Sequence, residues 1–159
     1  MSFAEPLEPR PTLTEMRQIV DEAMHLAARK SRTDQINLQL SVPEGAVDVF
    51  ADSAQVVSAL AAILSNAVES YTDPMGPVKV TVEPRESDTL IQVSDLGRGM
   101  NAETLRKATH PFFSAKPAGR QRGMGLSYAM RLIQLNRGTL QIESQPAHGT
   151  TVTITLPAE

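Results

Sequence analysis

The chain has 159 residues, enough for one domain with a buried core, and its formal net charge is −3. Apolar residues make up 41% and charged residues 21% of the sequence, as is typical of an ordinary globular domain. The slight acidity argues against a protein that binds nucleic acid by neutralising its phosphates. Because the chain contains no cysteine, it has neither a disulfide framework nor a thiolate metal site.

The first eleven residues are rich in proline and carry Glu5 and Glu8, which is the wrong chemistry for a signal peptide. We predict an extended tether over residues 1–11, leading in from an upstream segment, and one domain over residues 12–159. The longest apolar run, Ala59–Leu64, is far shorter than the ~18–20 residues that cross a bilayer. We therefore expect a cytoplasmic domain without direct membrane insertion, even if its parent protein is membrane-anchored.

Two helices are predicted in the first half of the chain. Thr12 and Glu15 have the spacing of a capping box, which predicts a helix that begins at Thr12 and continues to Leu26 or Ala27. A stronger helix begins at Asp52 or Ser53, because apolar residues recur there along one face at helical spacing. Its apolar stripe consists of Val56, Leu60, Ile63, Leu64, Ala67 and Tyr71.

Alternating or short apolar runs predict six strands, at residues 36–40, 47–50, 78–82, 90–95, 139–143 and 150–156. Residues 111–122 lack any period and are predicted to form a loop. A helix over 125–135 follows and ends at Asn136-Arg137-Gly138, a suitable C-cap. Strands in adjacent pairs with helices between them indicate an α+β fold, a two-layer sandwich with a mixed sheet packed against about three helices.

Asp95 is the first candidate functional residue. It shares the phase of Ile91 and Val93 in its strand, so its carboxylate should point inward with the apolar face. A buried carboxylate needs hydrogen-bond donors, and Gly97 and Gly99 directly after it would let a ligand approach the backbone. Taken alone, this pattern is more often a tight turn with an aspartate cap.

A second group of candidates suits a phosphate and a metal ion. The glycine loop Gly123–Leu126 opens a helix, where free amides and the helix dipole favour an anion, although a plain connector is an equal alternative. Asn66 is either a solvated helix residue or an amide ligand for Mg²⁺. The hydroxyl of Thr150 shares the phase of Val152 and should point inward. Four cations lie in or just before the predicted loop, namely Lys107, Lys116, Arg120 and Arg122.

The order of these motifs is more informative than any one of them. It runs Asn66, Asp95-Leu96-Gly97-Arg98-Gly99, Pro111-Phe112-Phe113-Ser114-Ala115-Lys116, Gly123-Met124-Gly125-Leu126-Ser127 and Gly149-Thr150. This series resembles the successive boxes of histidine kinase ATP-binding domains, which share the Bergerat fold with gyrase, heat-shock chaperones and mismatch-repair proteins. The resemblance covers nearly the whole chain, and Pro111–Lys116 is its most discriminating piece because it is similar to the kinase branch alone.

The resemblance implies a role for each matching residue. Asp95 would bind the amino group of adenine, Thr150 would support it through a water molecule, and Asn66 would coordinate Mg²⁺. The segment from Phe113 to Arg122 would be the ATP lid, with Lys116, Arg120 or Arg122 reaching the γ-phosphate. The full nucleotide site implied by the family comprises Asn66, Glu69, Ser70, Asp95, Gly97, Gly99, Met100, Phe113, Gly123, Met124, Gly125, Leu126, Ser127 and Thr150.

Several residues depart from the family pattern. Leu96 stands where the family often has Asn, and Gln121 replaces the first glycine of the usual Gly-x-Gly-x-Gly. Ala62 occupies the place of the glutamate base of the hydrolysing branch, so a self-contained ATPase is disfavoured. A nucleotide-binding regulatory module with weakened catalysis is therefore an alternative to a kinase. A serine kinase of the anti-sigma type ranks lowest, because that class usually lacks the phenylalanines at 112 and 113.

None of the three histidines, at positions 25, 110 and 148, has the setting of a phosphate acceptor. His25 lacks the acidic neighbour typical of an acceptor, and no long helical hairpin surrounds it. The resemblance thus implies the catalytic domain of a two-component sensor histidine kinase, whose cofactors are ATP and Mg²⁺. Its partners would be a separate dimerisation domain carrying the acceptor histidine and a downstream response regulator, and the isolated domain is expected to be monomeric.

Overall fold

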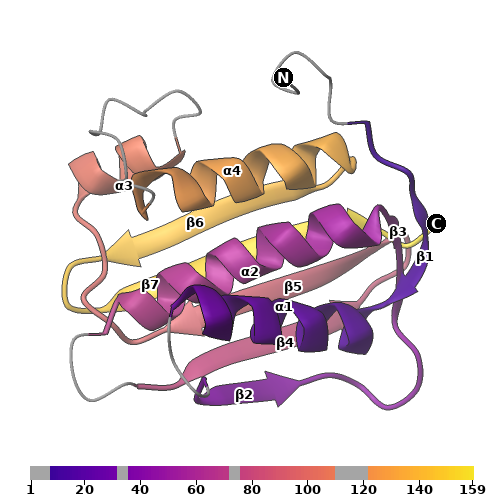
Figure 1. The fold of residues 1–159 in the computed structure, drawn as a ribbon, viewed down its shortest axis with the longest axis horizontal. Coiled ribbons are helices and arrows are strands. Elements are labelled where there is room, and N and C mark those ends of the chain that lie inside the picture. Colours follow the sequence, from indigo (N-terminus) through magenta and orange to yellow (C-terminus); the bar gives the residue numbers. More distant parts are fainter. Residues whose placement is uncertain (1–7, 32–35, 72–75, 110–121) are drawn as a thin grey trace.

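A computed structural model of the protein describes residues 8–31, 36–71, 76–109 and 122–159. A mixed five-stranded sheet, in the order β2-β4-β5-β7-β6, forms one layer, and α1, α2 and α4 lie side by side across it in the other (Figure 1). The elements are β1 (Thr12–Glu15), α1 (Met16–Lys30), β2 (Leu38–Ser41), β3 (Asp48–Ala51), α2 (Ser53–Glu69), β4 (Val78–Pro84), β5 (Asp88–Asp95), α3 (Ala102–Thr109), α4 (Arg122–Leu135), β6 (Thr139–Gln145) and β7 (Gly149–Pro157). The predicted α+β two-layer architecture is confirmed. None of the described helices is long and apolar enough to span a membrane.

The predicted helix start at Thr12 is wrong. Residues Thr12–Glu15 form β1, which pairs antiparallel with β3, and the first helix begins at Met16. The Thr12 hydroxyl lies 3.2 Å from the Thr14 hydroxyl and caps no helix, and Glu15 makes no side-chain cap either. Pairing with a strand more than thirty residues away satisfies the backbone groups of this segment, and β-branched threonines suit a strand.

The structure adds α3, which the sequence analysis did not predict, and it starts α4 at Arg122, earlier than the predicted Gly125. A cap signal for α3 was present, since the Thr104 amide donates to Asn101 Oδ1 at 2.8 Å. The helix is only eight residues long and its apolar positions are few. Short surface helices of this kind carry too weak a periodic signal to separate them from a loop. The six predicted strands are all present, with ends shifted by a few residues.

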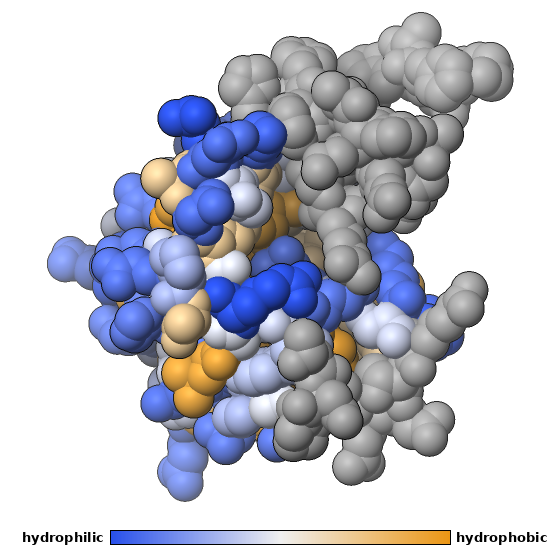
Figure 2. Space-filling model, turned by 90° about the vertical axis from the view of Figure 1, so that its left-hand side faces the viewer, coloured by the Kyte–Doolittle hydropathy of each residue, from blue (hydrophilic) through white to orange (hydrophobic). Residues whose placement is uncertain are grey.

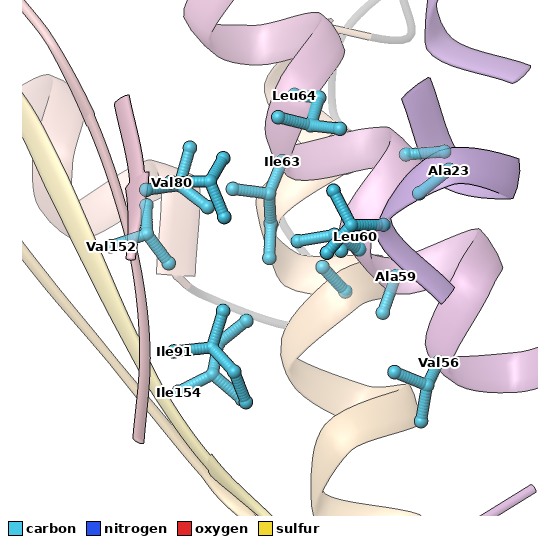
Figure 3. Close-up of a cluster of buried hydrophobic side chains, with 14 of the residues drawn as sticks. Ala23, Val56, Ala59, Leu60, Ile63, Leu64, Val80, Ile91, Val152 and Ile154 are labelled. Atoms are coloured by element: carbon cyan, nitrogen blue, oxygen red, sulfur yellow. The ribbon is translucent and has the colours of Figure 1, made fainter. Parts of the chain in front are cut away.

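The core lies between α2 and the sheet. The predicted stripe of α2 turns Leu60, Ile63 and Leu64 inward, and all three are fully buried. Figure 3 shows them facing β-branched side chains that project from the sheet, among them Ile91 and Ile154. Each such side chain contributes about 1.5–3 kcal/mol to folding when buried, so the α2–sheet contact holds the two layers together.

A buried asparagine joins the ends of α2 and α4. Asn136 is 4% exposed, and its Oδ1 accepts the Asp52 amide at 2.7 Å. Its Nδ2 donates to Gln55 Oε1 at 2.8 Å and to the Leu132 carbonyl at 2.9 Å. Asp52 is the N-cap of α2, with its carboxylate accepting the Gln55 amide. The amide side chain thereby connects the first turn of α2 to the last turn of α4.

Replacing Asn136 with alanine should lower the free energy of unfolding by about 2–3 kcal/mol, because buried donors and acceptors lose their partners. Urea denaturation would measure the change. Asn101→Ala serves as the matched control, since Asn101 makes one exposed cap bond and should cost only about 1 kcal/mol. Equal costs for the two variants would show that the joint between α2 and α4 does not stabilise the fold.

Candidate functional site

The polar end of the core is formed by Asp95 and Thr150. Buried residues alternate along β5, and Asp95 is the last of that row after Thr89, Ile91 and Val93. Thr150 is opposite Asp95 in the register of β5 and β7. Their exposed fractions are 5% and 4%, so both side chains point inward, as the strand phase predicted. A carboxylate and a hydroxyl thus terminate an otherwise apolar face.

The backbone after Asp95 packs tightly onto its neighbours. The Gly97 amide donates to Asp95 Oδ1 at 2.9 Å, and a Cβ at Gly97 would overlap the Ser70 hydroxyl. Gly99 has φ +67°, and a Cβ there would overlap the Gln145 carbonyl. Both positions require glycine for the close approach, and Gly99 requires it for the left-handed backbone as well. The Arg98 amide and carbonyl complete the turn through hydrogen bonds with Ser70 and Ala147.

Burial raises the pKa of the Asp95 carboxyl above its ordinary value. Hydrogen bonds from the Gly97 and Thr150 amides oppose that effect, and the nearby Ser70 hydroxyl and the charge of Arg98 oppose it as well. Desolvation is the largest of these influences, so the net pKa shift is upward. Burial therefore makes the charged form of Asp95 less favourable. A cationic or hydrogen-donating ligand would stabilise that charged form.

Ser144 lies at the centre of a second group of contacts beside Thr150. Its Oγ is 2.8 Å from the Met100 amide, 3.0 Å from the Gly149 carbonyl and 2.8 Å from Thr150 Oγ1. Ser144 was not among the residues predicted from the sequence. A signal was available, because Ser144 and Thr150 flank the predicted turn between the last two strands, where such residues face each other. Ser144 links the turn after Asp95 to the β6–β7 turn.

Tyr71 was predicted to be part of the apolar stripe of α2, but its hydroxyl has a polar role. It accepts the Leu96 amide at 2.6 Å and donates to the Pro77 carbonyl at 2.7 Å. A Cβ at Gly76 would overlap the Tyr71 ring, so the backbone passes close to the ring. These contacts connect the end of α2 to the start of β4 and to the residue after Asp95.

The predicted phosphate-side residues lie on α2 and α4, at one end of the molecule. In Figure 1 the last turn of α2, the first turn of α4, the end of β5 and the β6–β7 turn all lie at the left. Asn66 is half-buried, and the buried Ser70 hydroxyl donates to the Ala67 carbonyl at 2.6 Å. Glu69 Oε2 lies 3.5 Å from Ser31 Oγ. Figure 2 views this end and shows mainly hydrophilic colours on the described residues.

The first turn of α4 combines an open backbone with buried side chains. No described atom lies within 4 Å of a Cβ placed on Gly125. The side chains of Leu126 and Ser127 are both buried, and that of Leu126 belongs to the core. The buried Leu126 side chain fixes the helix start against the core, and the described residues leave the space beside Gly125 open, which suits an anion at a helix N-terminus.

Residues 51–159 match the model of the histidine kinase-, DNA gyrase B- and HSP90-like ATPases. The chain belongs to this family. Histidine protein kinase DivJ of Caulobacter vibrioides is 32% identical over 157 residues, which is 97% of this chain and 26% of DivJ. Sensor protein FixL of Bradyrhizobium diazoefficiens is 30% identical over 145 residues, 90% of this chain and 28% of FixL. The kinase-type ATP-binding domain thus spans about a quarter of the length of these relatives.

Solved structures share the fold of this histidine kinase ATP-binding domain. The catalytic domain of histidine kinase ThkA superposes with a TM-score of 0.75 at 24% identity, over 94% of this chain and 96% of that one. The mycobacterial sensor histidine kinase MprB gives a TM-score of 0.72 at 21% identity, over 93% and 97% of the two chains. These similarities confirm the predicted architecture.

Several predicted site residues of the kinase-type domain lie outside the described part of the chain. Phe113, Lys116 and Arg120 fall within residues 110–121, as does the departing Gln121. Arg122, Gly123 and Met124 lie in the first turn of α4, but their side chains are not described. The predicted lid, and the cation that would reach the γ-phosphate, therefore stay predictions. Of the residues that depart from the family pattern, Leu96 is 73% exposed and Ala62 packs against the core.

The raised pKa of Asp95 makes a testable difference to the pH dependence of stability. Because the folded domain holds this proton to higher pH than the unfolded chain, the group's contribution to stability is greatest below its ordinary pKa of 3.8 and falls as pH rises through the folded pKa. The Tm of Asp95→Asn, relative to that of wild type, should therefore increase over that window. Thermal unfolding between about pH 3 and pH 7 would measure it.

Asp88→Asn provides a control of opposite sign. The hydrogen bonds from Arg85, at 2.9 Å and 3.1 Å, lower the pKa of the Asp88 carboxyl. Its stabilising contribution is present above the ordinary pKa and is lost as pH falls through the folded pKa. The Tm of Asp88→Asn relative to wild type should thus fall slightly as pH rises. If both variants shifted in the same direction, the assignment for Asp95 would be incorrect.

Proposed function

We propose that the domain binds ATP with Mg²⁺ and donates the γ-phosphate to a histidine on a separate dimerisation domain. The observation that carries the proposal is the buried Asp95 carboxylate opposite Thr150, in a chain of this ATPase family. Burial still penalises the charge of this carboxylate despite the hydrogen bonds it accepts, and a buried group with a perturbed pKa is a candidate for ligand binding. The amino group of adenine is a donor of suitable chemistry for this acceptor.

The phosphates would lie at the start of α4. The space that the described residues leave beside Gly125 and the positive end of the helix dipole favour anionic oxygen atoms there. Phosphoryl transfer requires mainly positioning and charge neutralisation, and the cations Lys116, Arg120 and Arg122 are available in the sequence for that purpose. This chain would supply the donor half of the reaction, and the acceptor histidine would lie on the partner domain.

The residues present fit Mg²⁺ held largely by the nucleotide. Mg²⁺ commonly keeps several waters and takes one or two protein oxygens together with substrate phosphates. The half-buried Asn66, on the end of α2 near the start of α4, offers one amide oxygen. The described residues contain no group of three or more His, Cys, Asp or Glu that could hold the ion alone. Bound Mg²⁺ would neutralise phosphate charge, and Asn66 would hold its position.

Asn66→Ala should abolish the Mg²⁺ dependence of nucleotide binding and leave metal-free binding unchanged. The reason is that alanine removes the amide oxygen but no contact to the base. Calorimetric titration with a non-hydrolysable ATP analogue, with and without Mg²⁺, would measure both affinities. Ser65→Ala is a neighbouring control on the same helix, and it should retain the metal dependence. Unchanged metal dependence in Asn66→Ala would remove Asn66 from the site.

The decisive experiment for the proposed function is phosphotransfer from ATP to a supplied histidine-acceptor domain. The expected product is phosphohistidine, which acid removes, whereas phosphoserine would survive acid. A nucleotide-binding regulatory module is the alternative, and the exposed Leu96 beside Asp95 favours it. Nucleotide binding without transfer to any tested acceptor would support that alternative.

The partners of the domain follow from the same proposal. The dimerisation domain would precede this domain in a longer sensor kinase, with residues 1–11 as the tether between them. A response regulator would receive the phosphate from the acceptor histidine. The calorimetric titration uses this domain alone, so it tests the nucleotide site independently of both.

A further inference from the structure

The hydroxyl of Ser144 has three polar neighbours but only one proton to donate. It lies half-buried on β6, one step along the hairpin from the β6–β7 turn, and is paired with Thr150 in the strand register. Its three neighbours are the Met100 amide, the Gly149 carbonyl and Thr150 Oγ1, all within 3.0 Å. A serine hydroxyl offers one proton and two lone pairs, so the direction of each hydrogen bond can be assigned.

The two backbone groups have fixed roles in these hydrogen bonds. The Met100 amide can only donate, so it takes one lone pair of Ser144. The Gly149 carbonyl can only accept, so it takes the serine proton. One lone pair remains for Thr150, and the threonine hydroxyl must therefore donate to Ser144. The reverse direction would leave two acceptors, Ser144 Oγ and the Gly149 oxygen, 3.0 Å apart with no proton between them.

The direction of this hydrogen bond affects the proposed adenine site at Asp95 and Thr150. Because the proton of the Thr150 hydroxyl points to Ser144, this hydroxyl can only accept a hydrogen bond from a ligand. Thr150 is opposite Asp95 in the strand register. The site then presents two acceptors to a base, the Asp95 carboxylate on β5 and the Thr150 hydroxyl on β7. An adenine edge satisfies them, because its amino group donates directly. A bridging water can donate one proton to the Thr150 hydroxyl and its other proton to the unprotonated ring N1 of adenine.

We infer that Ser144 is a positioning residue for base specificity: it holds the Thr150 hydroxyl as an acceptor and so favours adenine over 6-oxopurines. The inference rests on the proposed function, since it concerns the same nucleotide site. Hypoxanthine carries a carbonyl in place of the amino group, and a carbonyl oxygen that faces an acceptor has no proton between the two. Its N1 proton is a donor and is compatible with an acceptor, so the discrimination rests on the carbonyl. Without Ser144, the Thr150 hydroxyl can rotate and donate to that carbonyl.

The test compares the affinities for the β,γ-imido analogues of ATP and ITP by calorimetric titration. Ser144→Ala should narrow the ATP-to-ITP affinity ratio by about three- to tenfold, the usual range for one hydrogen bond. Ser144→Thr keeps the hydroxyl and should restore the wild-type ratio. Ser94→Ala is the matched control, because Ser94 and Thr151 form a similar hydroxyl pair at 3.2 Å across β5 and β7, one residue from Asp95 and Thr150.

A second variant keeps the inference testable if Ser144→Ala fails to fold. Thr150→Val removes the acceptor and should narrow the ratio by a similar factor, and adding Ser144→Ala to it should change the ratio no further. If Ser144→Ala weakened both analogues equally, the ratio would stay unchanged, and the inference would be overturned in favour of a purely structural role. If the wild-type domain bound neither analogue, the proposed function would fail, and the inference with it.

Discussion

Asp95→Asn is expected to weaken ATP binding by about a hundredfold or more, equivalent to about 3 kcal/mol. Asp95 Oδ1 already accepts the Gly97 amide at 2.9 Å, so the single oxygen of an asparagine would remain there. Its amino group would then take the place of the second carboxylate oxygen. Two donors, the asparagine and the adenine amino group, would face each other with no acceptor between them. Titration with a non-hydrolysable ATP analogue would measure the loss.

The fold of this variant should be intact, which separates the effect on binding from an effect on stability. Burial penalises the charge of Asp95, and asparagine is neutral, nearly isosteric and still able to accept the Gly97 amide. At neutral pH the Tm of Asp95→Asn should equal or exceed that of wild type. Wild-type affinity in a folded Asp95→Asn would show that the base does not bind at this carboxylate.

Gly149→Ala is expected to lower the free energy of unfolding by about 3–5 kcal/mol. Gly149 has φ +84°, and a Cβ there would overlap the backbone carbonyl of Asp95. Both partners belong to paired strands, β5 and β7, so neither backbone can move without breaking the ladder. The substitution would disturb the pairing that places Asp95 opposite Thr150. Urea denaturation would measure the change in stability.

Gly45→Ala separates the steric overlap from the cost of the left-handed backbone. Gly45 has nearly the same conformation, φ +86°, but no atom of the described residues lies within 4 Å of a Cβ placed there. Its substitution should therefore cost only the conformational penalty, about 1–2 kcal/mol. A Gly149→Ala variant no less stable than Gly45→Ala would mean that the β5–β7 backbone can yield at this point.

Local pattern predicted most of the fold. The apolar stripe of α2 and the alternation of the strands are properties of short segments, and both survive folding because they match the faces that the core requires. The inward direction of Asp95 followed from the same alternation, through Ile91 and Val93. The order of the motifs, read as a resemblance, supplied the family.

Predictions failed where distant partners decide the structure. Thr12–Glu15 has a helix-cap pattern, yet pairing with β3 makes it a strand. Tyr71 fits an apolar stripe, yet its hydroxyl binds the Leu96 amide, twenty-five residues away. In both segments the local preference amounts to about 1 kcal/mol, which several long-range hydrogen bonds together outweigh.

The candidate site divides in the same way between sequence and tertiary structure. The residue types and the phase of Asp95 and Thr150 were determined by the sequence alone, because a strand turns alternate side chains to one face. Their placement opposite each other, and the Ser144 contacts that orient Thr150, depended on the strand order β5-β7-β6. That order results from pairing across more than fifty residues between β5 and β7, which a local pattern does not encode.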